Sequence, residues 1–273
     1  MTASNDSERF QSEADKYAAY LETPEGRLRL DQAFANVQEF LPLPQATQPL
    51  MALDLGGGTG ALTLRLARLG FHVTLMDSSA AMLDIAKRAA QVAGLAEMIE
   101  LKHGDADQLA KLFPAETFDL ILCHNVLEFV KNPAAVLNRA SVLMRDKSSI
   151  LSILVRNQAG EVLKAGIQSA DLAAAEYNLT AEWGNESLYG GKVRLFTAKS
   201  LQAMLTKASL SMAALRGVRV ISDYLLPQIS LSAQYENVFD LERKLGRRPD
   251  FAAIARYIQC LSRRAEPVMR GSG

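Results

Sequence analysis

The chain has 273 residues, of which 49% are hydrophobic, 7% aromatic and 22% charged. This length and composition predict one large globular unit with a sizeable core, and they exclude a disordered or low-complexity chain. No apolar run reaches the roughly 18 to 20 residues of a membrane span, and the polar first ten residues lack a signal-peptide core. The two cysteines, Cys123 and Cys260, lie far apart without metal-ligand spacing. We therefore expect a cytoplasmic protein with no metal site.

The net charge is zero, but the two parts of the chain carry opposite charge. Residues 1–191 contain 16 Lys and Arg against 24 Asp and Glu, whereas residues 192–273 contain 14 against 6. A basic C-terminal third indicates a polyanionic partner such as nucleic acid, and a chance clustering of solvated faces explains it equally well. Composition leaves both interpretations open.

Two helical patterns precede the first predicted strand, at Glu8–Leu21 and Gly26–Leu41. Thr23 followed by Pro24 is typical of a helix start, because a threonine hydroxyl caps free N–H groups and proline suits the first helical turn. The sequence therefore predicts a pair of N-terminal helices separated at this point.

A glycine cluster follows the first predicted strand, Leu50–Leu55. A helix over 61–69 and a second strand over 71–77 come next, which is the beginning of a βαβ unit. Glycines at such a turn let a nucleotide-like ligand approach the backbone and the helix N-terminus. Asp54, just before the cluster, suits a cationic ligand better than a pyrophosphate. The cluster consists of Gly56, Gly57, Gly58 and Gly60.

Helices and strands alternate through the rest of the chain. Further helices are predicted over 78–94, 132–147, 197–210 and 233–246. Further strands are predicted over 98–102, within 117–130, and over 148–157, 212–225 and 255–264, with Gly217 as a bulge. The pattern predicts a doubly wound α/β fold with a seven-stranded, mostly parallel sheet and one antiparallel edge strand. Residues 158–191 interrupt it and are expected to form a lid, inside which Trp183 packs.

The core motifs resemble those of a known family. "LDLGGGTG", the acid Asp77 closing the second strand, "GDA" and "FDLILCHNVLEF" are similar to the Rossmann-like (class I) S-adenosylmethionine-dependent methyltransferases, over about residues 45–155. The resemblance implies that the four glycines surround the methionine part of S-adenosylmethionine and that Asp77 binds the ribose hydroxyls. It also implies that Ser78, Asp105 and Ala106 lie beside the adenine and His124 near the sulfonium.

The two ends of the chain narrow the resemblance. "FQSEADKYAAYLETPEGRLRL", "GVRVISDYL" and "LERKLGRRPDFAAIARYIQCLSRR" are similar to bacterial tRNA carboxymethoxyuridine methyltransferases, which esterify the carboxylate of a modified wobble uridine. This likeness implies tRNA, bound at its anticodon loop, as the partner, and Arg29 as the residue that pairs with the methionine carboxylate. The chain departs from the family near 158–191, where "ESLYGGKVRLFTA" replaces a very basic stretch.

A carboxylate nucleophile is already ionised at neutral pH, so it needs a cation for positioning and no general base. Of the three histidines, His72, His103 and His124, the last alone is well placed to act as a base. Candidates for the positioning cation are Lys192, Arg194, Arg216 and Arg219, with Arg194 and Arg219 expected to face the pocket.

Several functions remain open at this point. The first is a tRNA carboxyl methyltransferase, and the second is a small-molecule O- or N-methyltransferase with 157–192 as its lid. The others are a cofactor-binding subunit without activity and a nicotinamide-dependent oxidoreductase, since Gly56, Gly58 and Ala61 also fit G-x-G-x-x-A. The expected organisation is one methyltransferase domain over 1–273. Its parts are a helical cap (1–45), the cofactor-binding core (46–156), the lid (157–192) and a basic part that completes the sheet (193–273).

Overall fold

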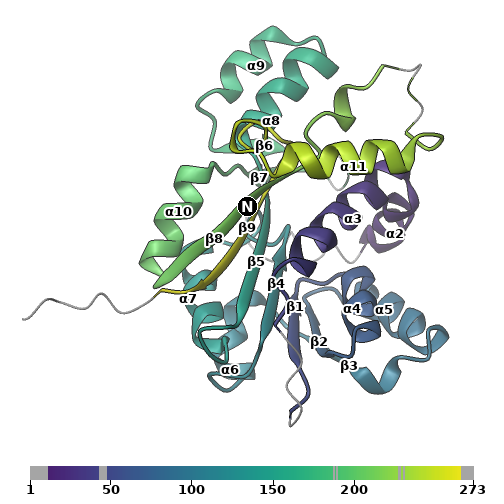
Figure 1. Cartoon of the computed structure of the whole chain (residues 1–273), viewed down its shortest axis with the longest axis vertical. Helices are drawn as coiled ribbons and strands as arrows, with labels where there is room; N and C mark the ends of the chain where they lie inside the picture. The colour runs from purple at the N-terminus through teal and green to yellow at the C-terminus, as the bar shows by residue number, and fades with distance from the viewer. Residues whose placement is uncertain are drawn as a thin grey trace, which may run out of the picture.

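A seven-stranded sheet forms the centre of the protein (Figure 1). The structure is a computed structural model and describes residues 12–42, 48–186, 188, 190–226, 229 and 231–265. The strand order is β3-β2-β1-β4-β5-β9-β8, and β9 runs antiparallel to both of its neighbours. The strands are β1 (Met51–Leu55), β2 (His72–Asp77), β3 (Ile99–His103), β4 (Leu120–His124), β5 (Ile150–Arg156), β8 (Leu210–Val218) and β9 (Tyr257–Arg264). The predicted sheet is thus confirmed, and its antiparallel strand lies second from the edge.

Helices cover both faces of this sheet. One face carries α6 (Leu109–Leu112), α7 (Pro133–Leu143) and α10 (Ala198–Lys207). The other carries α3 (Pro24–Gln38), α4 (Ala61–Arg68) and α5 (Ala80–Val92), with α2 (Ala14–Glu22) and α11 (Tyr235–Gly246) packed on α3. Short elements connect these: η1 (Ala96–Met98), η2 (Ala106–Gln108), η4 (Ser222–Tyr224) and α12 (Pro249–Ala252).

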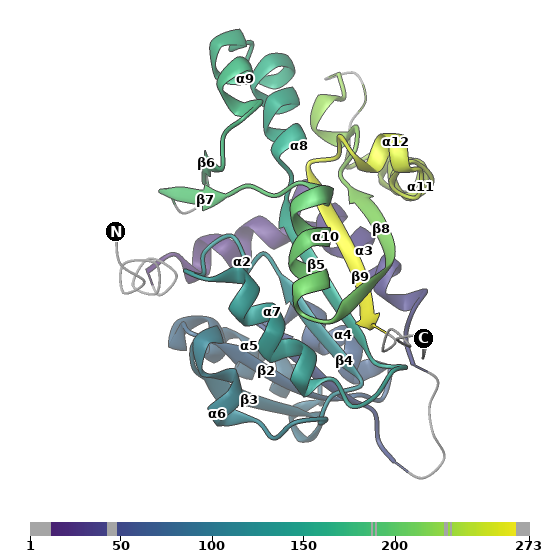
Figure 2. The ribbon, with the colours of Figure 1, turned by 90° about the vertical axis from the view of Figure 1, so that its left-hand side faces the viewer.

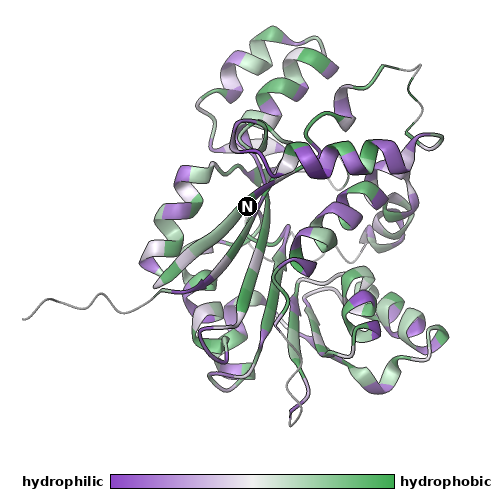
Figure 3. Ribbon diagram, in the orientation of Figure 1, coloured by the Kyte–Doolittle hydropathy of each residue, from purple (hydrophilic) through white to green (hydrophobic). Residues whose placement is uncertain are grey.

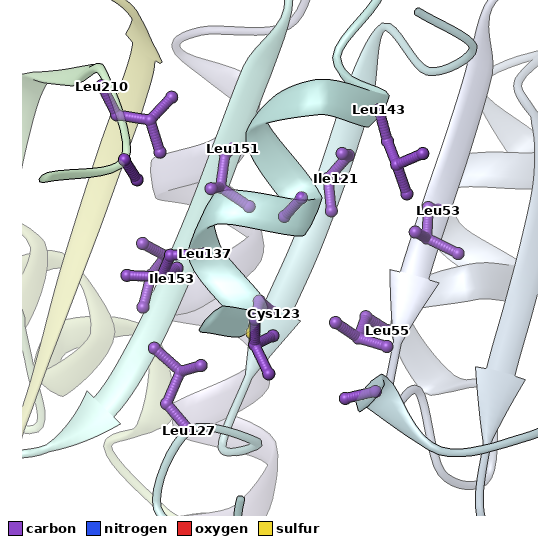
Figure 4. Packing of buried hydrophobic residues seen from close by; sticks show 14 of the residues in the cluster. Leu53, Leu55, Ile121, Cys123, Leu127, Leu137, Leu143, Leu151, Ile153 and Leu210 are labelled. Carbon is purple, nitrogen blue, oxygen red and sulfur yellow. The ribbon is translucent and has the colours of Figure 1, made fainter. Parts of the chain in front are cut away.

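The central strands are buried on both faces, and their side chains alternate between two cores. Leu53, Ile121 and Leu151 lie in one core cluster with Leu137 and Leu143 of α7 (Figure 4). Their strand neighbours, such as Leu120, belong to the opposite core under α3 and α4. Figure 3 shows the result, with mostly hydrophobic strands between helices that alternate in polarity. Truncating one of these leucines to alanine is expected to cost about 2–5 kcal/mol.

The predicted helix caps position the N-terminal helices. The Thr23 hydroxyl accepts a hydrogen bond from the Gly26 backbone N–H at 3.1 Å, and Pro24 is the first residue of α3. The helix therefore begins two residues earlier than the apolar pattern predicted. The start of the first predicted helix, Glu8–Leu21, falls partly outside the described residues.

The prediction of one long strand over 212–225 is wrong in two respects. The irregularity in β8 lies between Met212 and Ala214, not at Gly217. The strand ends at Val218, and Arg219 takes a left-handed backbone conformation with φ of 58°. Gly217 has a different role, because a Cβ on Gly246 would lie 2.2 Å from the Gly217 carbonyl oxygen. The backbones of α11 and β8 touch there.

The segment after β5 lies across the carboxyl end of the sheet. It contains α8 (Gln158–Leu163), the π-helical turn η3 (Lys164–Gln168), α9 (Leu172–Asn178) and the ribbon of β6 (Trp183–Asn185) and β7 (Lys192–Arg194). In Figure 2 these elements lie above the sheet, and the arrowhead of β9 points away from them. Trp183 does not pack inside this segment as expected: it is 40% exposed and the Arg194 guanidinium lies 4.4 Å from its ring centre. No described helix is long and apolar enough to cross a membrane.

Candidate active site

A cavity of about 410 Å³ opens at the carboxyl ends of the parallel strands. Its walls come from the turns after β1 to β5, from α2 and α3, from the segment over the sheet, and from the start of β9. Open α/β sheets bind ligands at this edge, and a volume of roughly 300–1,000 Å³ is typical of small-molecule sites. The architecture thus predicts a binding site here before any side chain is considered.

The glycine turn forms one wall of the cavity. Gly56 and Gly58 have φ of 65° and 55°, and the Gly58 N–H donates to Asp77 Oδ2 at 2.9 Å. A Cβ at position 58 would lie 3.3 Å from the Tyr17 ring and 3.9 Å from the Met82 sulfur, both of which also line the cavity. Glycine therefore leaves this space open for a ligand, as a nucleotide-like cofactor requires.

The other two glycines of the cluster lie behind this wall. Gly60 caps α4 with φ of 79°, and a Cβ on Gly57 would lie 2.7 Å from the Asp54 carboxyl carbon. Asp54 accepts a hydrogen bond from the Thr63 hydroxyl at 2.7 Å, and burial raises its pKa to about 6. It lines a small adjoining pocket with Arg29 and His124 instead of the main cavity, so its place near a cationic ligand stays a prediction.

The ends of β2 and β3 supply an acidic wall. Asp77 Oδ2 accepts the Gly58 N–H and Oδ1 accepts the Ser79 N–H. The Ser78 N–H also hydrogen-bonds this carboxyl, and burial raises its pKa. A carboxylate has about four acceptor positions, which leaves capacity for a ligand hydroxyl. Ser78, Asp105 and Ala106 line the same wall.

Arg29 is buried and lines the cavity, which excludes the alternative of a helix-surface arginine. Its Nη1 donates to Asn125 Oδ1 and its Nη2 to the Tyr17 hydroxyl, both at 3.2 Å. The guanidinium also lies 5.1 Å from the Tyr20 ring centre and 5.7 Å from that of Tyr257. These contacts hold a positive charge at the junction between the glycine turn and the rest of the cavity.

His124 ends β4 and also lines the cavity. Its Nε2 lies 2.8 Å from Ser152 Oγ, and its Nδ1 has no hydrogen-bond partner within the described chain. Burial, with a further contribution from Arg29, lowers its pKa to about 3. The ring is therefore neutral at physiological pH and is a very weak base, so the structure gives no support to His124 as a general base.

The structure thus places eight of the ten predicted cofactor residues on one cavity and two, Gly57 and Gly60, behind it. The predicted substrate-positioning residues divide differently. Arg219 lines the cavity, but Arg194 does not, because it points to the opposite side of β7 from the cavity residue Val193. Arg216 pairs with Glu39 at 3.3 Å, and Lys192 is exposed; neither lines the cavity.

Several cavity residues escaped the sequence analysis. Arg156 ends β5, and the strand register places it opposite Tyr257, the first residue of β9. Its position at the carboxyl end of a predicted parallel strand was the available signal. Tyr257 is buried, and the centre of its ring lies 5.9 Å from the guanidinium groups of both Arg156 and Arg256. Burial acts to raise the pKa of Tyr257, but the positive charges of the neighbouring arginines outweigh it and lower that pKa. Other such cavity residues are Tyr17, Tyr20, Asn125, Glu128, Lys164, Glu186 and Asp223.

Charge is distributed unevenly around the cavity. The wall at β2 and β3 carries Asp77, Asp105 and Asp107. The opposite part, under the segment over the sheet, gathers positive side chains together with a few acids. Those positive side chains are Arg156, Lys164, Arg219 and Arg256. Within the described residues no group of three or more His, Cys, Asp or Glu is arranged to hold a metal ion.

Comparison with known proteins defines the class. A family model described as a methyltransferase domain matches residues 53–151. A solved structure from Thermotoga maritima, an S-adenosylmethionine-dependent methyltransferase described as a possible histamine N-methyltransferase, superposes with a TM-score of 0.62 at 14% identity and covers 94% of this chain and 99% of its own. The chain is a Rossmann-like S-adenosylmethionine-dependent methyltransferase. These matches favour a methyltransferase over a nicotinamide-dependent oxidoreductase.

Two curated relatives point to more specific functions. The chain is 28% identical to the tRNA 5-carboxymethoxyuridine methyltransferase of Escherichia coli K12 over 265 residues, which cover 94% of this chain and 96% of that protein. It is 30% identical to a ubiquinone biosynthesis O-methyltransferase of Xylella fastidiosa, over 50% of this chain and 55% of that protein. The first likeness therefore includes the cap, the segment over the sheet and the C-terminal strands, whereas the second spans about half of the chain.

Proposed function

We propose that the chain methylates the carboxylate of carboxymethoxyuridine at the wobble position of tRNA, in the cytoplasm and as a single methyltransferase domain. S-adenosylmethionine supplies, when bound, an activated methyl group on a sulfonium. In this proposal Gly56 and Gly58 border its methionine part, and Arg29 pairs with the methionine carboxylate. Asp77 accepts the ribose hydroxyls, while Ser78, Asp105 and Ala106 border the adenine. Neutral His124 lies at the sulfonium end, where an imidazolium would repel the positive sulfur.

The observation that carries the choice of acceptor is the cationic part of the cavity. It gathers Lys164 and three arginines in the part of the cavity where this proposal places the acceptor, and the cavity residue His124 has a pKa of about 3. A carboxylate acceptor matches both features, because its pKa of about 4 leaves it charged at pH 7 without a base. The protein's task is then to hold the oxygen in line with the methyl group and to exclude water. The likeness to the tRNA enzyme along nearly the whole chain supports the same choice.

A small-molecule O- or N-methyltransferase is the alternative. Its support is the likeness to ubiquinone O-methyltransferases and the lack of the very basic stretch expected near 158–191. A phenol or amine acceptor must lose a proton, however, and the weakly basic His124 is poorly suited to remove it.

Methyl-labelled cofactor distinguishes the two proposals. The protein is incubated with total tRNA and, separately, with a metabolite extract from cells that lack this enzyme. We expect label in the tRNA fraction, released as methanol by mild alkali because the product is an ester. An alkali-stable label, or label in the metabolite fraction alone, would overturn the carboxylate proposal and favour the small-molecule enzyme.

A further inference from the structure

The cationic part of the cavity contains more arginines than lysines, but the arginines are already engaged. Arg156 Nη2 lies 2.5 Å from Glu186 and its Nη1 3.5 Å from Glu161. Arg256 Nη1 lies 2.6 Å from Glu161, and its Nε 3.7 Å from Asp223. Buried carboxylates thus neutralise both guanidinium groups.

Arg219 is held in the same way. It is paired with Asp223 and donates from Nη1 to the Tyr20 hydroxyl at 3.1 Å. To bind Arg219, a substrate carboxylate would have to displace Asp223 from this buried ion pair. The Asp223 carboxylate would then be buried without a partner, which is costly. The three arginines therefore form a rigid, nearly neutral framework rather than a free anion site.

Lys164 is different. It is half-buried, it lines the cavity, and its ammonium makes no ion pair or hydrogen bond with any residue that the structure describes. Burial lowers its pKa, and the charges of Arg256 and Arg156 act in the same direction, with Glu161 opposing them. An anion beside Lys164 would remove this penalty. Lys131 also lines the cavity without a described ion pair, but it is exposed, so water screens its charge.

The backbone around Lys164 is also unusual. Lys164–Gln168 forms a π-helical turn directly after α8, and Gln168 lines the cavity as well. Such turns are rare and occur often at functional sites, because the wider turn reorients side chains relative to a regular helix. Here the turn belongs to the segment over the sheet, so Lys164 lines the cavity from a different part of the chain than the glycine turn.

We propose that Lys164 binds the carboxylate of the methyl acceptor directly and so selects a charged acceptor over its neutral ester. The inference rests on the proposed function and names the residue that gives it specificity. Lys164 thus takes the carboxylate-positioning role that the sequence analysis gave to Arg194, which lies outside the cavity. Arg219 keeps a supporting role in the cavity wall. Because the methyl ester is uncharged, the same contact favours substrate over product.

The test compares the affinity for tRNA bearing carboxymethoxyuridine with that for the same tRNA bearing its methyl ester, in the presence of S-adenosylhomocysteine. The wild type should prefer the carboxylate by roughly 10- to 100-fold, the range of one charged hydrogen bond. Lys164→Gln should abolish the preference and raise KM more than it lowers kcat. Lys164→Arg should restore part of the preference for the carboxylate. Lys147→Gln should behave as wild type, because Lys147 is exposed and precedes β5, at the end of the strands away from the cavity.

Two further measurements make the outcome decisive. The affinity for S-adenosylhomocysteine and the midpoint of thermal unfolding should be unchanged in Lys164→Gln, which excludes misfolding. If the wild type forms the ester and Lys164→Gln still prefers the carboxylate as strongly, Lys164 is not the carboxylate ligand, although the proposed function stands. If the wild type forms no ester on this tRNA, the proposed function itself is wrong.

Discussion

Arg29 shows how one side chain can be tested for a ligand role separately from a structural one. It is buried and held by Tyr17 and Asn125. If it pairs with the methionine carboxylate, Arg29→Ala should lower the affinities for S-adenosylmethionine and S-adenosylhomocysteine by a similar factor of roughly 10 to 100. Both ligands carry that carboxylate. Calorimetric titration of both ligands and of adenosine measures this.

Adenosine is the control for the Arg29 experiment, because it lacks the carboxylate. Its affinity should not change in Arg29→Ala, and Arg29→Lys should keep the charge but lose the paired N–H geometry, with an intermediate effect. An equal loss of adenosine affinity would show that Arg29 acts by holding the walls of the cavity together.

Asp54 makes the stability of the protein depend on pH. Its pKa is about 6 in the folded protein against an ordinary value of 3.8, so the folded state holds the proton more tightly than the unfolded state. Stability from this group is therefore greatest below about pH 4 and falls as the pH rises to about 6, by about 3 kcal/mol for two pKa units. Asp54→Asn keeps an acceptor for Thr63 and should remove that loss, as urea unfolding at pH 4.5 and pH 7 would reveal.

Asp146 provides a control of opposite sign for this measurement. Hydrogen bonds from Ser148 lower its pKa, so its contribution is present above the unfolded pKa and is lost as the pH falls. Asp146→Asn should therefore cost stability at pH 7, and less at lower pH. If the free energy of unfolding changes with pH equally in Asp54→Asn and in the wild type, Asp54 is not the origin of this pH dependence.

At the scale of elements, α11 and α12 carry the basic surface beside the cavity. They lead directly into β9, whose first residue, Tyr257, lines the cavity. Of the basic residues here, Arg247 is paired with Glu39, whereas Lys244 and Arg248 are exposed. These two are the better candidates for contacts with phosphate groups.

The double variant Lys244→Glu/Arg248→Glu tests this surface. We expect weaker tRNA binding and a shallower dependence of log affinity on log salt, by roughly one unit for each phosphate group that the variant no longer binds. Cofactor affinity should stay unchanged. Lys87→Glu/Arg88→Glu, on the exposed face of α5, makes the same change in net charge at another place and should have a smaller effect. Equal effects of the two pairs would mean that only overall charge matters.

At the scale of the whole molecule, the cavity joins residues from the two parts of the chain that differ in net charge. The acidic wall comes from the ends of β2 and β3, in the part of the chain with excess Asp and Glu, while Arg219 and Arg256 come from the basic part. Folding brings these parts together because β9 and β8 extend the sheet beside β5. The basic part of the sequence thus contributes two arginines to the cavity, where Asp223 and Glu161 neutralise their charges.

Local sequence determined much of this protein. The strands, the caps at Thr23 and Ser79, the glycine turn and the position of Asp77 at a strand end all follow from patterns within a few residues, because backbone sterics and burial act at that range. The same patterns placed His124 and Asp105 at strand ends, where parallel strands converge on one edge.

Tertiary structure alone decided which charged groups are available to a ligand. Arg216 pairs with Glu39, 177 residues away, and Arg156 pairs with an acid of the segment that covers it, 30 residues on. Arg194 points away from the cavity because of its position in the three-residue strand β7. Side chains alternate along a strand, so a shift of the register by one residue would have turned Arg194 toward the cavity. Ion pairing depends on distances between segments that the folded chain brings together, so a list of basic residues could name the candidates but could not separate the neutralised arginines from Lys164.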